Sequence, residues 1–113
     1  RLKKGFALLA YYLKTESSLS TYSVDKIITL KDKKFLSEDW VNVYLQDVID
    51  SLGNYLILDI PKRDLTINKK SEYFSKSNIP EIKILFINGR FTYSDFVKRD
   101  QQLKDRLFKF FSK

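Results

Sequence analysis

Residues 51–70 read S-L-G-N-Y-L-I-L-D-I-P-K-R-D-L-T-I-N-K-K and join three patterns in succession. An acidic helical pattern ends at Gly53, where a left-handed C-terminal cap favours glycine. The apolar run over 55–60 is typical of a buried strand, and Pro61 ends it. Asn68 can then cap a short helix, because its side chain can accept hydrogen bonds from amides two or three residues on. The stretch therefore predicts a helix, a buried strand and a second helix.

The sequence predicts two helices and a strand between residues 2 and 52. Residues 2–16 repeat apolar side chains every three or four positions, which is typical of an amphipathic helix. The side chains at this spacing are Leu2, Phe6, Leu9 and Leu13. Residues 22–30 are rich in β-branched side chains and predict a strand. Ser37 can cap a helix over 37–52. The expected buried face of that helix consists of Trp40, Val41, Tyr44, Leu45, Val48, Ile49 and Leu52.

The last third of the chain predicts a second strand or short helix and then a long helix. Residues 81–87 suit either a strand or a helical turn, and Asn88-Gly89 marks a turn after them, so a hairpin is one alternative. Thr92 can cap a helix that runs to about Phe111 and carries a wide apolar face. Together the elements predict an α+β fold, a small, mainly helical domain with a short β-hairpin or two to three strands.

Length and composition predict one domain with one hydrophobic core. The 113 residues match the commonest domain size, about 100–150 residues. A hydrophobic content of 43% separates the chain from disordered sequences. The chain has no cysteine and no histidine, which excludes disulfides, thiolate or imidazole zinc sites and a histidine general base. A metal site would need oxygen ligands and would suit magnesium or calcium.

The net charge of +7 is unevenly distributed along the chain. Residues 37–52 contain only acidic charges, whereas basic residues gather on both sides of them. The gathered basic residues are Lys31, Lys33, Lys34, Lys62, Arg63, Lys69, Lys70, Lys76, Lys98, Arg99, Lys104, Arg106, Lys109 and Lys113. A basic domain can neutralise phosphates and bind nucleic acid. Simple solubility explains a charge of this size equally well.

Nothing in the sequence predicts contact with a membrane. No apolar run approaches the roughly 20 residues of a membrane-spanning helix, and the first residues have no signal-peptide layout. We therefore expect a cytoplasmic protein. The chain starts at Arg1 and an apolar helical pattern begins at once, so we expect this single domain, residues 1–113, to be a piece of a longer protein.

Several short motifs follow one another in an order that one nuclease family also has. They are R-L-K-K-G-F-A-L-L at 1–9, S-V-D-K-I-I-T at 23–29, Trp40, L-G-N-Y-L-I-L at 52–58, N-K at 68–69, K-S-E-Y at 70–73, F-T at 91–92, and Arg99 with Leu103. With this order the chain resembles the C-terminal HNH-type nuclease domain of GmrSD-like, modification-dependent restriction endonucleases. The resemblance covers nearly the whole chain, and it implies a ββα-metal core within a restriction or defence protein.

The resemblance implies a degenerate catalytic site. The family's strand motif T-I-E-H-I-L-P aligns with residues 23–29, which places Lys26 at the general-base histidine and Asp25 at the preceding glutamate. The ordinary lysine pKa of about 10.4 would have to fall by about three units for a base near neutrality. Of two family asparagines, the first position holds Arg63 and the second coincides with Asn68. The implied catalytic positions are therefore Asp25, Lys26 and Asn68, which would use Mg²⁺ or Mn²⁺ if the site is active.

Other residues receive binding or structural roles from the same resemblance. On the face where the family places its DNA, the expected phosphate contacts are Lys62, Arg63, Lys69 and Lys70. The retained structural positions are Gly53, Asn54 and Arg99. A buried Arg99 would pair with a carboxylate such as Asp25 or Asp59. The sequence assigns no metal ligand set and no oligomeric state.

Three functions are open from the sequence. A degenerate HNH-like domain would bind DNA, or another domain of its parent protein, without efficient cleavage, and the replacement of the histidine favours this hypothesis. An atypical site with Asp25, Asn68 and a divalent cation would instead make the chain an active DNA endonuclease. The third hypothesis is a structural interaction module that docks through the wide apolar face of its last helix.

Overall fold

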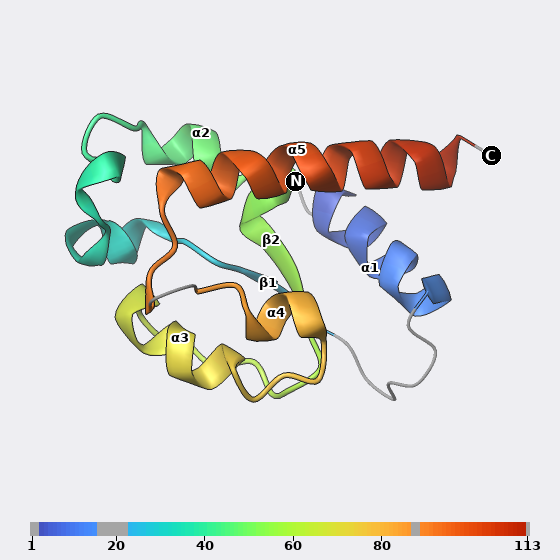
Figure 1. Ribbon diagram of the computed structural model, residues 1–113, viewed down its shortest axis with the longest axis horizontal. Coiled ribbons are helices and arrows are strands. Elements are labelled where there is room, and N and C mark those ends of the chain that lie inside the picture. The colour runs from blue at the N-terminus through green and yellow to red at the C-terminus, as the bar shows by residue number, and fades with distance from the viewer. Residues whose placement is uncertain (1–2, 16–22, 87–88, 113) are drawn as a thin grey trace.

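The computed structural model describes residues 3–15, 23–86 and 89–112 and is mainly helical (Figure 1). Its α-helices are α1 (Lys3–Thr15), α2 (Leu45–Ile49), α3 (Ile67–Phe74), α4 (Pro80–Lys83) and α5 (Tyr93–Phe111). Its 3-10 helices are η1 (Leu30–Phe35), η2 (Glu38–Trp40) and η3 (Leu52–Asn54). Strands β1 (Ser23–Lys26) and β2 (Tyr55–Leu58) pair antiparallel, with Lys26 opposite Tyr55. The predicted α+β class is confirmed.

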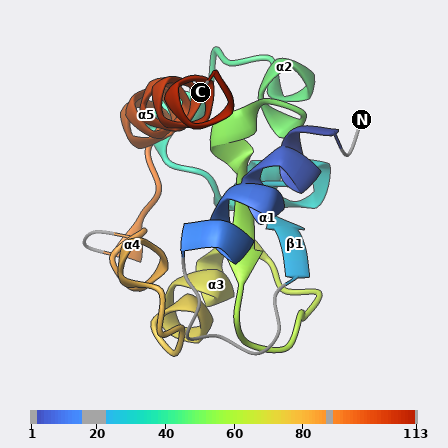
Figure 2. The same cartoon turned by 90° about the vertical axis from the view of Figure 1, so that its right-hand side faces the viewer.

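Helices surround the small sheet on several sides. Helix α1 packs on β1 and β2, and α5 runs past η3, where β2 begins (Figures 1 and 2). Helices α3 and α4 lie on the other side of the molecule from α5 in both views. The core includes Leu8, Tyr12, Ile27, Ile28, Trp40, Tyr55, Leu56, Ile57, Leu58, Phe74, Ile82, Phe96, Leu103 and Leu107. Strand β2 is buried at every position, as its apolar sequence predicts.

Helix α1 faces the sheet with only part of its apolar pattern. Leu8 and Tyr12 are buried and Leu9 packs against the core, whereas Phe6 is 57% exposed and Leu13 is 58% exposed. Gly5 shares the buried face, and a Cβ at Gly5 would lie 2.6 Å from Val24 Cγ1. The missing side chain lets α1 approach β1 closely, so a glycine and not a large apolar residue faces the strand here.

The helix predicted over residues 37–52 is divided into η2 and α2. Between and beside these pieces Val41 is 80% exposed and Tyr44 is 63% exposed, so neither belongs to a buried face. Trp40 explains the division, because its indole Nε1 donates to Phe91 O at 2.9 Å and its ring contacts aromatic side chains at the start of α5. This anchor fixes Trp40 against a distant segment, and the continuous helix was a wrong prediction.

Asp39 makes a second link between η2 and α5. Its carboxylate accepts hydrogen bonds from the Ser37 hydroxyl at 2.5 Å and from Tyr93 N at 2.8 Å. The Ser37 hydroxyl, helped by backbone amides, holds the pKa of Asp39 below its ordinary value of 3.8, against a smaller opposing effect of burial.

The lowered pKa of Asp39 predicts a pH-dependent contribution to stability. Because the folded-state pKa is the lower one, the ionised form stabilises the fold above the unfolded-state pKa, and this stability is lost as pH falls through the folded-state pKa. We expect Asp39→Asn to lower the melting temperature at neutral pH and to have no such effect in strong acid, where Asp39 is protonated. Thermal unfolding followed by circular dichroism measures the melting temperatures of the unaltered chain and the variant at each pH. An equal drop in melting temperature at neutral and at acid pH would contradict the prediction.

Strand β1 (Ser23–Lys26) is shorter than the strand predicted over residues 22–30. Residue 22 lies outside the described part of the chain. Asn54 takes the place of a strand partner at Ile28, because Ile28 N donates to Asn54 Oδ1 and Asn54 Nδ2 donates to Ile28 O, each at 2.8 Å. Thr29 N then donates to Asp32 Oδ2 at 2.9 Å, which begins η1. Side-chain groups therefore end the sheet earlier than β-branched composition suggests.

Helices α3 and α4 also differ from the sequence predictions. Thr66, not Asn68, occupies the N-cap of α3, and its hydroxyl donates to Oδ1 of Asn68, the second residue of the helix, at 2.5 Å. Residues 81–83 belong to α4, which begins at Pro80, a residue that suits the first turn of a helix. The hairpin alternative is therefore wrong for the described residues, and 87–88 lie outside them.

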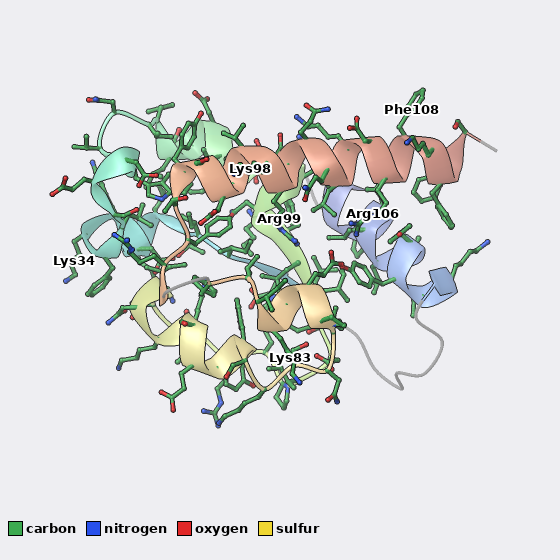
Figure 3. All side chains as sticks on the ribbon, viewed as in Figure 1. Lys34, Lys83, Lys98, Arg99, Arg106 and Phe108 are labelled. Carbon is green, nitrogen blue, oxygen red and sulfur yellow. The ribbon has the colours of Figure 1, made fainter. Side chains whose placement is uncertain are left out.

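Helix α5 agrees with its prediction. Thr92 Oγ1 accepts from Asp95 N at 3.0 Å, and Thr92 N donates to Asp95 Oδ2 at 2.9 Å, which is a capping box. One face of α5 enters the core, whereas Phe108 is 75% exposed and projects away from the molecule (Figure 3). Neither α5 nor any other helix among the described residues is long and apolar enough to cross a membrane.

Candidate nucleic-acid interface

Asp25 and Lys26 are neighbours in β1, and their side chains therefore point to opposite faces of the sheet. The Asp25 carboxylate accepts from Lys26 N at 2.8 Å and lies 3.9 Å from Lys62 Nζ. Lys26 Nζ instead donates to Asp50 at 3.0 Å and lies 5.3 Å from the centre of the Tyr55 ring. The two positions that the resemblance aligns with the family's Glu-His pair thus have different surroundings.

Asp25 lines a pocket of about 340 Å³, which we call the basic pocket. Its lining residues are Asp25, Thr29, Lys31, Lys62, Arg63, Asp64, Leu65 and Lys70. Four of them are basic and two are acidic, so the pocket is net positive. Lys31 pairs with Asp64, and Lys62 Nζ donates to Val24 O at 3.1 Å. The pocket lining thus contains two more basic than acidic side chains.

Lys70 forms the inner wall of the basic pocket. It is only 4% exposed, and its Nζ donates to Ile27 O at 2.7 Å and to Lys26 O at 3.1 Å. Burial lowers the pKa of the Lys70 ammonium, and the carboxylates of Asp32 and Asp25 oppose this shift. The fully buried Asp32 lies 4.0 Å from Lys70 Nζ and accepts from the first amide of α3 at 2.8 Å. Lys70 and Asp32 together fasten α3 to the end of β1.

Lys62 and Arg63 extend the basic pocket to the solvent. Both side chains are exposed, and the Arg63 guanidinium lies 5.2 Å from the centre of the Tyr73 ring. This distance is within the range of a cation–π interaction, which orients the guanidinium. Lys69 is exposed on α3 but does not line the pocket. The structure thus brings together Lys62, Arg63 and Lys70 from the predicted phosphate contacts and leaves Lys69 outside.

Asn68 lies outside the basic pocket as well. It lines a second pocket of about 680 Å³, whose walls also include Glu38 and Arg90. The predicted catalytic positions Asp25, Lys26 and Asn68 are therefore in three separate environments. The structure does not assemble them into one site.

The basic pocket does not fit a divalent cation. Within residues 3–15, 23–86 and 89–112, no group of three or more histidine, cysteine, aspartate or glutamate side chains is placed to hold a metal ion. Mg²⁺ needs several oxygen ligands in near-octahedral arrangement. Asp25 faces the Lys62 ammonium, and the Lys70 ammonium already occupies the oxygen-lined inner wall. The Mg²⁺ or Mn²⁺ expected for an active enzyme therefore finds no ligand set among these residues.

Arg99 and Gly53 join α5 to the beginning of β2. The Arg99 guanidinium is 8% exposed and donates to Gly53 O at 3.1 Å and to Tyr55 O at 2.8 Å (Figure 3). Burial lowers the pKa of Arg99 to about 10, with Glu81 opposing the shift, so the side chain is still protonated at neutral pH. The predicted pairing of Arg99 with Asp25 or Asp59 was wrong, because the guanidinium reaches main-chain carbonyls instead.

Sequence reasoning gave no role to two charged residues around the interface, Asp32 and Asp50, and counted Lys31 only among the basic residues of the chain. The spacing of Thr29 and Asp32 is that of a helix capping box, which could have located Asp32 at the start of η1. No local pattern marks Asp50 as the partner of Lys26, because 24 residues separate them.

Comparison of the chain with protein-family models, with curated proteins and with solved structures gives no match in any of the three.

Proposed function

We propose that this chain is a DNA-binding domain of degenerate HNH type, which holds the DNA backbone at the basic pocket without efficient cleavage. The observation that carries the proposal is the gathering of Lys31, Lys62 and Arg63 around one pocket, whose inner wall holds the buried ammonium of Lys70. They come from η1, from the segment after β2 and from α3, so the fold concentrates them. Lysine and arginine contacts to phosphates supply most of the sequence-independent affinity for DNA.

The order of the elements supports the HNH-like part of the proposal. Strand β1 pairs antiparallel with β2, and α3 follows β2 along the chain. Lys70 and Asp32 then fasten α3 to the end of β1. An antiparallel pair of strands and a following helix that contacts the end of β1 support this part of the proposal, although η1, η2, α2 and η3 lie between the two strands. In the proposal this unit presents the basic pocket to DNA, as part of a larger restriction or defence protein.

Four observations favour binding over cleavage. The chain has no histidine, and Lys26 forms an ion pair with Asp50 on the other face of the sheet from Asp25. Asp25 lies beside the Lys62 ammonium, and Asn68 belongs to another pocket. Hydrolysis of a phosphodiester needs a group that activates water and a stabilised leaving oxygen. The described residues offer phosphate contacts but no such assembled pair.

A partner domain of the parent protein is the second candidate ligand, and α5 carries the observation that favours it. Phe108 is 75% exposed, Phe111 is 54% exposed and Val97 is 45% exposed. Apolar side chains of this size on one helix are typical of a surface that packs against another protein. The two candidates use different parts of the molecule and are therefore compatible.

The proposed function predicts salt-dependent DNA binding without nicking. A labelled DNA duplex is titrated with the chain at increasing salt, and supercoiled plasmid is incubated with the chain and Mg²⁺ or Mn²⁺. We expect the logarithm of the affinity to fall linearly with the logarithm of salt, by about 0.9 per contacted phosphate, and the plasmid to stay supercoiled. Absence of salt-dependent binding would refute the DNA-binding proposal. Nicking that disappears in Asp25→Ala would establish the endonuclease alternative instead.

A further inference from the structure

The pocket that contains Asn68 takes no part in the phosphate contacts described above. It has a volume of about 680 Å³, within the usual range of roughly 300–1,000 Å³ for small-molecule sites. We call it the aromatic pocket. The lining residues that matter for its chemistry are Phe35, Glu38, Asn68, Phe86, Arg90 and Phe91. Helices η1 and α3 contribute residues both to this pocket and to the basic pocket, so the two pockets flank the same pair of elements.

The aromatic pocket has a rigid apolar floor. The rings of Phe86 and Phe91 lie 6.1 Å apart at 60°. Phe91 is 3% exposed and is held by Trp40, whose indole Nε1 donates to Phe91 O and whose ring centre lies 6.3 Å from that of Phe91. Phe35 is 39% exposed and stands at the rim. The buried Phe91 therefore supports the floor from beneath, and the accessible aromatic surface comes from the half-buried Phe86 and from Phe35. Such a surface suits a flat ring system, because stacking a base on an aromatic side chain is favourable.

Two exposed lining residues of opposite charge, Glu38 and Arg90, face this pocket. Among the described residues, neither the Glu38 carboxylate nor the Arg90 guanidinium has a hydrogen bond or ion pair with another side chain or with the backbone. Asp39 beside Glu38 is different, because Ser37 and Tyr93 already engage its carboxylate. Glu38 and Arg90 thus offer an acceptor and a cation to a ligand that carries hydrogen-bond donors at one end and an anion at the other.

Asn68 supplies a third, oriented group. Its Oδ1 accepts the Thr66 hydroxyl at 2.5 Å, which fixes the amide and leaves Nδ2 as a donor without a partner in the described part of the chain. A donor amide beside an acceptor carboxylate suits the edge of a nucleobase, which presents both kinds of group.

We propose that the aromatic pocket binds an unstacked guanine nucleotide. The base lies against Phe86 and Phe35, its adjacent N1–H and amino groups donate to the two oxygens of Glu38, and its phosphate contacts Arg90. Guanine is favoured because its pairing edge places two donors side by side, which matches a carboxylate. The inference deepens the proposed function, on which it rests, because a guanine in this pocket would belong to a strand whose neighbouring phosphates lie at the basic pocket.

The test uses the complete chain and four mononucleotides. GMP, AMP, CMP and TMP are titrated by calorimetry, and the emission of Trp40, the single tryptophan of the chain, reports on the pocket floor. We expect saturable binding of GMP, at least tenfold tighter than that of the other three. Glu38→Gln should weaken GMP about tenfold, which corresponds to about 1.4 kcal/mol, and remove the preference for guanine. Arg90→Gln should weaken GMP but leave guanosine, which has no phosphate, unaffected.

A matched control and the outcomes separate this inference from the proposed function. Asp47→Asn makes the same charge change on the exposed side of α2 and should leave GMP binding unchanged. Equal binding of all four nucleotides would overturn the inference, and so would the absence of saturable GMP binding. Displacement of bound GMP by a free amino acid would overturn it as well. If DNA still binds in a salt-dependent way while GMP does not, only the guanine pocket fails. If GMP binds and DNA does not, the DNA-binding proposal fails and the pocket stands.

Discussion

Gly53→Ala is expected to destabilise the protein by about 3 kcal/mol and to lower its melting temperature by roughly 10 °C or more. A Cβ at Gly53 would lie 2.6 Å from Asp100 Cβ and 2.7 Å from Asp100 Cα, and backbone cannot move aside as a flexible side chain can. The same contact brings Gly53 N to Asp100 Oδ1 at 2.7 Å. The substitution would therefore push η3 from α5 and weaken both this hydrogen bond and the Arg99 contact to Gly53 O.

Gly89→Ala is the control for the change in Gly53. Gly89 has φ of +75°, but a Cβ there meets nothing within 4 Å, so its replacement adds backbone strain of about 1–2 kcal/mol without a clash. Thermal and denaturant unfolding of both variants, followed by circular dichroism, give the comparison. Equal stability of the two variants would contradict the close approach of η3 and α5.

The second large effect is expected in DNA binding. Reversal of two charges at the mouth of the basic pocket, Lys62→Glu with Arg63→Glu, should weaken binding of a DNA duplex by about 100-fold at low salt. Each reversal removes an attraction for a phosphate and adds a repulsion. Both side chains are exposed, so the fold should persist, and circular dichroism checks this. Fluorescence anisotropy of the labelled duplex measures the affinity.

The matched control for this double variant is Lys98→Glu with Lys109→Glu. These two lysines are exposed on α5 and are not part of the basic pocket, and their reversal changes the net charge by the same amount. We expect the control to weaken binding only a few-fold, through the overall charge. An equal loss in both double variants would mean that net charge, rather than the basic pocket, determines affinity.

Local signals in the sequence were sufficient where a short segment determines its own structure. Thr92 as a helix cap and the apolar period after it predicted α5, and the apolar run after Asn54 predicted β2. These elements depend on backbone groups within a few residues and on burial of one continuous face. The basic residues Lys62, Arg63 and Lys70 were likewise visible as a cluster along the chain.

Contacts between distant segments were not predictable in the same way. Gly53 fits a helix cap by its position in the sequence, yet its actual constraint is Asp100, which lies 47 residues later. Trp40 has the spacing of a helix face, but its hydrogen bond to Phe91 O divides that helix. Asn68 lies two residues before Lys70 in the sequence and still lines the other pocket, because a helix sends successive side chains to different sides.

The most direct test of the account is the salt dependence of DNA binding for the unaltered chain and for Lys62→Gln with Arg63→Gln. If each of the two side chains contacts one phosphate, the slope of log affinity against log salt should fall by about 2 in the double variant. This slope counts phosphate contacts directly, independently of absolute affinity. An unchanged slope would contradict the claim that the basic pocket is the DNA-binding site.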